Sequence, residues 1–161
     1  MPMGTRSRQV GNDRWTLSIF AATRGILGCV EEGQMTENEI AKIIVDVAYQ
    51  VHVALGPGLL ESVYQEVMVY ELRKRGLQVS AKEPVSIVWD DLKFEKGYET
   101  DLTVEGKVIV ELKSVEELHR AHKKQLLTYL RLGDKRLGLL INFGEALIKD
   151  GITRIVNNLN E

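Results

Sequence analysis

Two neighbouring stretches, Tyr98-Glu99-Thr100-Asp101 and Val108-Ile109-Val110-Glu111-Leu112-Lys113, decide how this chain folds. The second stretch is built of Val, Ile and Leu, yet it carries an acid and a lysine. Side chains alternate between the faces of a strand, so Glu111 and Lys113 point to one side while Val110 and Leu112 point to the other. Charges on an apolar strand are costly unless they pair or bind something. This stretch therefore predicts a buried strand with a polar site on one face.

The turn between the two stretches decides whether Asp101 can join that site. If the strands pair in antiparallel fashion, an odd-length loop around Glu105 and Gly106 places Asp101 on the face of Glu111. A two-residue turn would place it on the other face. We expect a three-residue loop with Gly106 in the left-handed region, or a bulge.

These residue types suit a divalent metal beside a phosphodiester. Mg²⁺ (or Mn²⁺) prefers oxygen ligands, so Asp101, Glu111 and the backbone carbonyl of Leu112 are suitable. A metal-bound water has a lowered pKa and can attack phosphorus. Lys113 could position or deprotonate that water, or neutralise charge on the phosphate. The alternative is a structural ion pair between Glu111 and Lys113 on an exposed strand.

Two helical segments carry further candidates. Glu61 and Tyr64 lie three residues apart on one helix face, after the break Gly56-Pro57-Gly58. Glu61 could instead be a first-turn acid that the helix dipole favours. A later helix carries Gln125 and Tyr129, one helical turn apart.

A basic cluster precedes Gln125 and begins a few residues after Lys113, where a phosphate backbone would need it. Its alternative is a solvated helix face. Its two histidines could bind zinc, but no third ligand is near them in the sequence. The cluster comprises His119, Arg120, His122, Lys123 and Lys124.

The element order predicts an α/β or α+β fold on a mixed sheet, in the order ααβββαβ(β). The first helix begins with a capping box at Thr36 and Glu39, and the second precedes Gly76. The predicted helices cover Thr36 to Leu55, about Leu59 to Gly76, and Val115 to Leu132. The predicted strands are Val85–Trp89, Lys93–Thr103, Lys107–Lys113, Leu137–Asn142 and a possible Ile152–Val156.

The 161 residues suit one domain, residues 35–161, after an N-terminal arm, residues 1–34. We expect the arm to be disordered or to reflect a mis-called start, and its apolar run is too short to span a membrane. Without the arm, 17 basic and 20 acidic residues remain, so a nucleic-acid site must concentrate its cations. The single cysteine, Cys29, forms no disulfide within the chain, which fits a reducing cytoplasm.

Taken together, these motifs resemble a known family. The segment Gly58-x-x-Glu61-x-x-Tyr64 is the namesake of the small bacterial and archaeal GxxExxY proteins, which belong to the PD-(D/E)XK nuclease superfamily. The resemblance covers roughly Ile40 to the C-terminus. Its other motifs are Glu83-Pro84-Val85, Tyr98-x-x-Asp101, Val110-Glu111-Leu112-Lys113, Gln125-x-x-x-Tyr129-Leu130 and Gly138-Leu139-Leu140-Ile141-Asn142-Phe143-Gly144.

The resemblance implies a restriction-endonuclease-like core and a role for each matching residue. Asp101 and Glu111 would be metal ligands and Lys113 the catalytic lysine. Glu61 would be the helix acid added to the metal site, and Gln125 the helix glutamine of related exonuclease-type sites. Thr100 stands where the superfamily's name has Pro, which is often absent.

The function expected from the resemblance is a Mg²⁺-dependent nuclease, with DNA the more expected substrate than RNA. The alternatives are a non-catalytic nucleic-acid-binding or regulatory module, and a homo-oligomeric scaffold whose Tyr/Gln helix face is an interface. The small size favours low sequence selectivity or a targeting partner protein. The residues expected to contact nucleic acid are Arg120, His122, Lys123, Lys124, Tyr64 and Tyr129.

Overall fold

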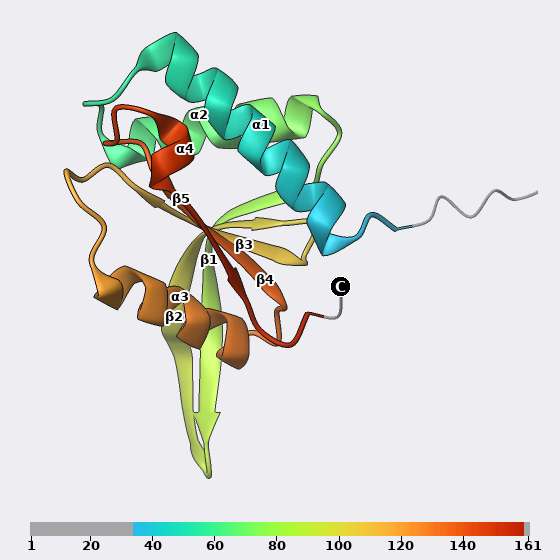
Figure 1. Ribbon diagram of the computed structural model, residues 1–161. Coiled ribbons are helices and arrows are strands. Elements are labelled where there is room, and N and C mark those ends of the chain that lie inside the picture. Colours follow the sequence, from blue (N-terminus) through green and yellow to red (C-terminus); the bar gives the residue numbers. More distant parts are fainter. Residues whose placement is uncertain (1–33, 160–161) are drawn as a thin grey trace, which may run out of the picture. The chain divides into compact units, whose positions relative to one another are not determined.

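The computed structural model describes residues 34–159, and residues 35–159 belong to one compact unit (Figure 1). The expected arm, apart from Gln34, lies outside the described residues, as does Cys29. No helix in the described range is both long and apolar enough to cross a lipid bilayer.

The first helix, α1 (Glu37–Leu55), begins and ends where the sequence predicts. The amide of Glu39 donates to Thr36 Oγ1 at 3.3 Å, and the amide of Thr36 donates to Glu39 Oε2 at 2.8 Å. This reciprocal pair satisfies amides that a helix start leaves free. The helix ends at Gly56, whose φ of 67° lies in the left-handed region.

The second helix, α2 (Glu61–Lys74), starts later than the predicted Leu59. The hydroxyl of Tyr64 accounts for the delay, because it donates to the carbonyl of Gly56 at 2.6 Å and accepts from the amide of Leu59 at 3.2 Å. These bonds hold the connecting loop in a non-helical path. Gly76 follows the helix with φ 84°, as its predicted place after the C-terminus requires.

Five strands form one mixed sheet in sequential order. β3 and β4 are parallel, and every other neighbouring pair is antiparallel, which confirms the predicted mixed sheet. The first strand starts before the predicted Val85, because polar Ser80, Lys82 and Glu83 hide any apolar alternation. The strands are β1 (Val79–Trp89), β2 (Leu92–Val104), β3 (Val108–Lys113), β4 (Leu137–Asn142) and β5 (Ile152–Val156).

The third helix, α3 (Arg120–Leu132), corrects the predicted start at Val115. The buried side chain of Asn142 holds Val115 out of the helix, because Asn142 Oδ1 accepts from the Val115 amide at 3.0 Å and Nδ2 donates to the Val115 carbonyl at 2.8 Å. Asn142 Oδ1 also accepts from the amide of Gly144 at 3.1 Å. One side chain therefore fixes the connections that follow β3 and β4.

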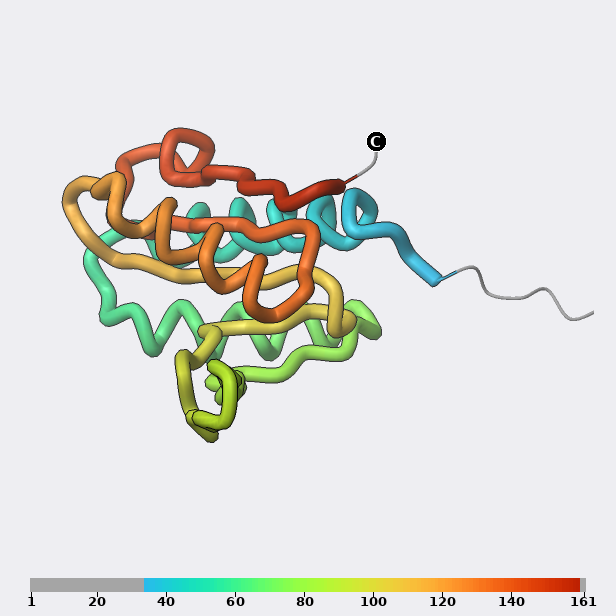
Figure 2. The backbone as a smooth tube through the Cα atoms, turned by 90° about the horizontal axis from the view of Figure 1, so that it is seen from below, coloured from blue at the N-terminus to red at the C-terminus, as the bar shows by residue number. Residues whose placement is uncertain are grey.

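Helices cover both faces of the sheet (Figures 1 and 2). The larger core lies under α1, α2 and the short α4 (Ile148–Gly151), which the sequence did not predict. It contains Leu102, Val110 and Leu112 from the strands. The smaller core lies under α3 and consists of Ile109, Leu126, Leu130 and Leu140. The alternation of β3 thus leaves the face of Ile109, Glu111 and Lys113 on the α3 side.

Replacing Asn142 tests whether this side chain holds the two connections. We expect Asn142→Ala to lower the free energy of unfolding by about 2–4 kcal/mol, because it removes hydrogen bonds and leaves buried backbone groups unpaired. The measurement is urea denaturation followed by circular dichroism. Asn38→Ala, which removes an exposed hydrogen bond with Arg154, is the control and should cost less than about 0.5 kcal/mol. Equal costs for the two variants would contradict this role.

Candidate active site

The β2–β3 turn meets the condition that the sequence set for Asp101. The register pairs Val104 with Val108 and Leu102 with Val110. The loop therefore has three residues, in which Glu105 and Gly106 take φ of 53° and 62°. This register confirms the expected three-residue loop. If it is continued, Asp101 lies opposite Glu111.

The backbone pairing of β2 with β3 ends at Leu102 and Val110, next to Asp101. Beyond this point the Asp101 carboxylate, in place of the backbone, bonds to β3. Asp101 Oδ2 accepts from the amide of Leu112 at 2.9 Å. At the same point β2 departs from regular alternation. The hydroxyls of Thr100 and Thr103 lie 3.1 Å apart, although residues three apart face opposite sides of a regular strand. Asp101 is therefore a fixed and buried acid at a distortion of the sheet.

Glu111 and Lys113 form the second part of the site. Lys113 Nζ donates to Glu111 Oε1 and to the carbonyl oxygen of Leu112, both at 2.8 Å. It lies 4.0 Å from Asp101 Oδ2. Glu111 Oε2 is buried and has no hydrogen-bond partner among the described residues. One buried carboxylate oxygen is therefore left to bind something else.

Lys82 is a site residue that the sequence reasoning missed. Its Nζ lies 2.5 Å from Asp101 Oδ1, and its backbone φ of 52° is unusual for a residue other than glycine. The pairing of β1 with β2 continues through Glu83 with Thr100 and Ala81 with Leu102, which sets Lys82 opposite Asp101. Lys82 could have been found only if β1 had been predicted to start at Val79.

The pKa values of Glu111, Lys113 and Lys82 are all raised in this site. Burial raises the pKa of Glu111, and the nearby carboxylates of Asp101 and Glu61 raise it further against the opposing effect of Lys113. Burial lowers the pKa of Lys113, but its hydrogen bond to Glu111 and the surrounding acids outweigh burial and raise it. Lys82 behaves in the same way, with Asp101 as its main partner. Burial thus raises the pKa of the acid, whereas the neighbouring carboxylates raise the pKa values of the two lysines.

Glu61, the first residue of α2, lies within electrostatic reach of this site. Its carboxylate raises the pKa values of Glu111, Lys113 and Lys82. Across residues 34–159, however, no three His, Cys, Asp or Glu side chains lie close enough to form a ready metal cluster. The role of Glu61 as a metal ligand thus stays a prediction.

The predicted contact of Tyr64 with nucleic acid is wrong, because Tyr64 is 0% exposed. Its ring stacks on Phe143 at 4.3 Å between centroids. Its hydroxyl closes the loop from Gly56 to Leu59, in which Gly58 has a φ of 101°. Tyr64 therefore shapes the loop that leads into Glu61.

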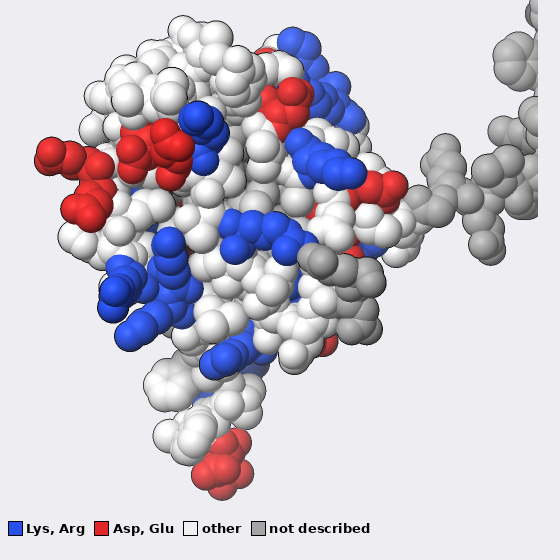
Figure 3. Space-filling view, viewed as in Figure 1, with Lys and Arg blue, Asp and Glu red and all other residues white. Residues whose placement is uncertain are grey.

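The candidates on α3 divide between a hydrogen-bonded pair and an exposed basic surface. Gln125 Nε2 donates to Tyr129 Oη at 2.6 Å, and the Tyr129 ring stacks on Tyr98 at 4.2 Å. The Gln125 side chain is thus bonded within its own helix, and its catalytic role stays a prediction. Lys and Arg side chains gather over α3 in Figure 3; the exposed ones near its start are Arg120, Lys123 and Lys124.

His122 links the start of α3 to the site. Burial lowers the pKa of His122, and the positive charges of Lys113 and His119 lower it further. Its Nδ1 accepts from the amide of His119 at 3.3 Å, so it helps to cap the helix. No third ligand joins the two histidines within the described residues, so nothing supports a zinc site there.

The donor set fits a divalent metal ion. Two carboxylates, Asp101 and Glu111, flank the backbone carbonyl of Leu112, and hard cations prefer such oxygens. The strongest support for this fit is Glu111 Oε2, because this buried oxygen has no hydrogen-bond partner among the described residues. Lys82 donates to Asp101 Oδ1, Lys113 donates to Glu111 Oε1, and the Leu112 amide donates to Asp101 Oδ2.

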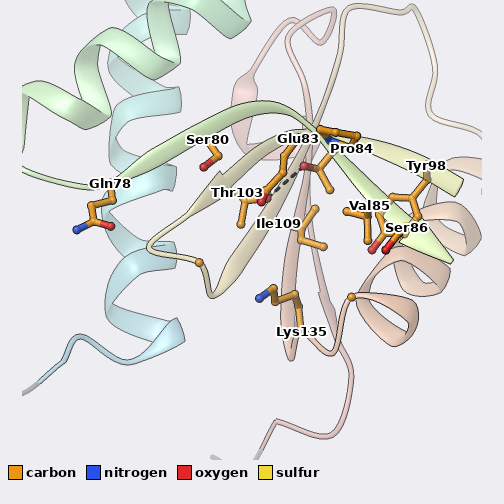
Figure 4. A pocket seen from close by; sticks show the side chains of 13 residues that line it. Gln78, Ser80, Glu83, Pro84, Val85, Ser86, Tyr98, Thr103, Ile109 and Lys135 are labelled. Carbon is orange, nitrogen blue, oxygen red and sulfur yellow. Dashed lines mark hydrogen bonds between the residues drawn. The ribbon is translucent and has the colours of Figure 1, made fainter. Parts of the chain in front are cut away.

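A separate pocket lies on the α3 side of β2, near the C-terminal end of α3 (Figure 4). Its volume is about 420 Å³, and its lining includes Glu83, Tyr98, Thr103, Ile109 and Lys135. None of Asp101, Glu111 and Lys113 lines it. It is therefore not the cavity of the candidate metal site.

Removing Lys113 tests the charge balance of the site. We expect Lys113→Met to lower the free energy of unfolding by about 1–3 kcal/mol at pH 8, because it leaves the buried Glu111 carboxylate without its cation. Glu111 has a pKa above its unfolded value, so its charged form opposes folding above that raised pKa. This unfavourable contribution disappears as the pH falls toward the pKa that Glu111 has in the unfolded chain. The stability loss caused by Lys113→Met should therefore be smaller at pH 5 than at pH 8. The measurement is urea denaturation at both pH values.

The exposed Lys93, which pairs with Glu95 at 2.9 Å, provides the matched control. Lys93→Met should change the free energy of unfolding by less than about 0.5 kcal/mol at either pH. A Lys113→Met loss that grows toward pH 5 would refute the charge argument.

Comparison with known proteins agrees with this geometry. The family model of the PD-(D/E)XK nuclease superfamily matches residues 38–155, which include Asp101, Glu111 and Lys113 and all strands except the last residue of β5. No curated protein and no solved structure matches the chain. The match covers well over half of the sequence, and the mixed sheet flanked by helices is compatible with the superfamily's restriction-endonuclease-like core. The chain belongs to the PD-(D/E)XK nuclease superfamily.

Proposed function

We propose that this protein is a metal-dependent nuclease that hydrolyses phosphodiester bonds, with Mg²⁺ or Mn²⁺ as its cofactor and DNA preferred over RNA. The observation that carries the proposal is the buried, unpartnered Glu111 Oε2 beside Asp101 and Lys113. Superfamily membership supports nuclease chemistry. The segment from Gly58 to Tyr64 supports the narrower assignment to the GxxExxY proteins.

In this proposal Asp101, Glu111 and the carbonyl of Leu112 hold the metal ion. When bound, the metal supplies Lewis-acid chemistry that activates water and neutralises charge on the phosphate. Lys113 already donates hydrogen bonds to Glu111 and to the carbonyl of Leu112. In this proposal its ammonium positions water or stabilises the developing negative charge on the phosphate.

Lys82 and α3 supply the positive charge toward the substrate. The Lys82 side chain is half-exposed and sits on the carboxylate that would bind the metal. Its exposed ammonium could donate a hydrogen bond to a phosphate bound beside Asp101. The basic side chains at the start of α3 would hold the neighbouring backbone, so binding should weaken as salt increases.

A cleavage assay tests the proposed activity. The protein is incubated with single- and double-stranded DNA and RNA in Mg²⁺, Mn²⁺ or EDTA. We expect cleavage that needs metal, and we expect Lys113→Met and Asp101→Asn each to slow it by about 10²- to 10³-fold, because Asp101 would hold the metal ion and Lys113 would stabilise charge at the phosphate. Lys93→Met, remote from the site, should leave the rate unchanged.

Two outcomes would contradict this proposal. Cleavage that survives both Lys113→Met and Asp101→Asn would remove the assigned site. Binding of nucleic acid without cleavage in every metal would favour the non-catalytic module.

Metal binding tests the place of Lys82 without any cleavage. We expect Lys82→Met to bind Mn²⁺ about two- to fivefold more tightly, because a half-exposed ion pair with Asp101 no longer competes with the metal. Isothermal titration calorimetry measures the affinity. Lys96→Met is the control, since Lys96 pairs instead with Glu99 and should leave the affinity unchanged. Weaker Mn²⁺ binding by Lys82→Met would show that Lys82 supports the metal site.

A further inference from the structure

The pocket on the α3 side of β2 contains buried polar groups that the candidate metal site does not use (Figure 4). Tyr98, Thr100 and Thr103 line it, and these residues are only 7%, 1% and 6% exposed. Its volume of about 420 Å³ is in the range of sites that bind small organic groups. The pocket is thus large enough for a ligand and offers it hydrogen-bonding partners.

One hydroxyl hydrogen in this pocket has no acceptor among residues 34–159. The hydroxyls of Thr100 and Thr103 lie 3.1 Å apart and share one hydrogen bond, the dashed line in Figure 4. Each hydroxyl carries one hydrogen, so their mutual bond uses one and leaves the other. Neither hydroxyl has a second partner in the part of the chain that the structure describes. Because an unsatisfied buried donor is costly, an acceptor atom of a ligand would be favoured here.

Two charged side chains, Glu83 and Lys135, line the pocket from different sides. Glu83 belongs to β1, whereas Lys135 follows α3 and precedes β4, and β2 and β3 lie between these two strands. Thr103 and Ile109 of the middle strands therefore lie between the two charged side chains (Figure 4). Within residues 34–159, neither the carboxylate nor the ammonium forms a hydrogen bond or an ion pair. The pocket thus offers an acceptor on one side and a donor on the other.

This arrangement matches guanine better than the other bases. Guanine has two N–H donors, N1 and N2, on its Watson–Crick edge, and these suit the Glu83 carboxylate. Its other edge has the acceptors O6 and N7, which suit the Lys135 ammonium. In cytosine the amino group and the carbonyl share one edge, so one of the two charges would face C–H groups. Adenine and thymine place acceptors on both sides of their donor, and these acceptors would repel the carboxylate.

A basic face of α3 connects the pocket to the candidate active site. Arg120, Lys124 and Arg131 follow one another at intervals of four and seven residues, so they lie along one face of the helix. All three are exposed, and the helix from Arg120 to Arg131 is about 16 Å long. Its start lies near the metal site through His122, and the residues that follow its end line the pocket. A single strand that follows these cations would pass from the metal site to the pocket.

We propose that this pocket binds a guanine base of the nucleic-acid strand that the protein cleaves. The inference rests on the proposed function, because it names part of the substrate of that nuclease. Strand β2 connects the two sites, since Thr100 and Thr103 of the pocket flank Asp101 of the metal site. Cleavage would then occur at a fixed distance from a guanine. The pocket gives this small domain a limited sequence preference.

Oligonucleotide binding in EDTA tests the pocket without any cleavage. Fluorescence anisotropy compares the affinity of the full-length protein for a ~15-nucleotide oligothymidylate and for the same strand with one central guanine. We expect the guanine to tighten binding about tenfold, because both of its polar edges gain a charged partner. A cytosine or an adenine at the same position should change the affinity by less than about threefold.

Base analogues and variants identify the partner of each edge. Inosine lacks the 2-amino group that would donate to Glu83, and 7-deazaguanine lacks the N7 atom that would accept from Lys135. Both analogues should bind the wild type more weakly than guanine does. Glu83→Ala should no longer distinguish guanine from inosine, and Lys135→Met should no longer distinguish guanine from 7-deazaguanine. Glu95→Ala and Lys93→Met, which break an ion pair outside the pocket, are the matched controls and should keep the full guanine preference.

Three results would overturn the proposal, provided that circular dichroism shows every variant to be folded. The first is equal affinity of the wild type for all four bases. The second is a guanine preference that survives in both Glu83→Ala and Lys135→Met. The third is micromolar binding of free 5′-GMP in calorimetry without any guanine preference among the oligonucleotides, since the pocket would then take a free nucleotide.

The same measurements separate this inference from the nuclease assignment. A guanine preference that depends on Glu83 and Lys135, in a protein that cleaves nothing in any metal, would support the pocket and contradict only the proposed activity. Metal-dependent cleavage by a protein that binds all four bases equally would support the activity and overturn the pocket.

Discussion

The hydrogen bond from the Leu112 amide to Asp101 Oδ2 is the contact on which the candidate site depends. The regular ladder between β2 and β3 ends at Leu102 and Val110, and the carboxylate accepts the amide that lies beyond this end. Asp101 is thereby fixed beside Glu111 without leaving the sheet. The same distortion brings Lys82 of the outer strand over Asp101. A polar centre can thus be built in a sheet whose other face packs the main core.

The site contains more acidic than basic groups. Asp101, Glu111 and the more distant Glu61 face two lysines, and one oxygen of Glu111 stays unpaired. Burying such an excess costs stability, since an unpaired charge in a protein interior is poorly solvated. A divalent cation would offset that excess. The stability cost and the proposed affinity for a metal ion thus follow from the same arrangement of charges.

The structure of the loop before α2 explains why Gly58, Glu61 and Tyr64 occur at this spacing. Gly58 takes a backbone conformation that other residues rarely adopt. Tyr64 is buried and ties the loop to itself through its hydroxyl. Glu61 then stands at the first position of the helix. The motif therefore works as a unit in which a glycine and a tyrosine position an acid.

The sequence by itself determined the features governed by local rules. Alternation in β3 placed Glu111 and Lys113 on one face, the capping box started α1, and Gly106 set the turn that brings Asp101 level with Glu111. These features depend on neighbours within a few residues, which the sequence displays directly.

Only the tertiary structure decided the features that depend on distant neighbours. Tyr64 is buried because Phe143 stacks on it, and α3 starts late because Asn142 holds Val115. Lys82 reaches Asp101 through a strand pairing that polar residues concealed. Burial and charge partnership are properties of packed surfaces, and residue type alone does not specify which surfaces meet.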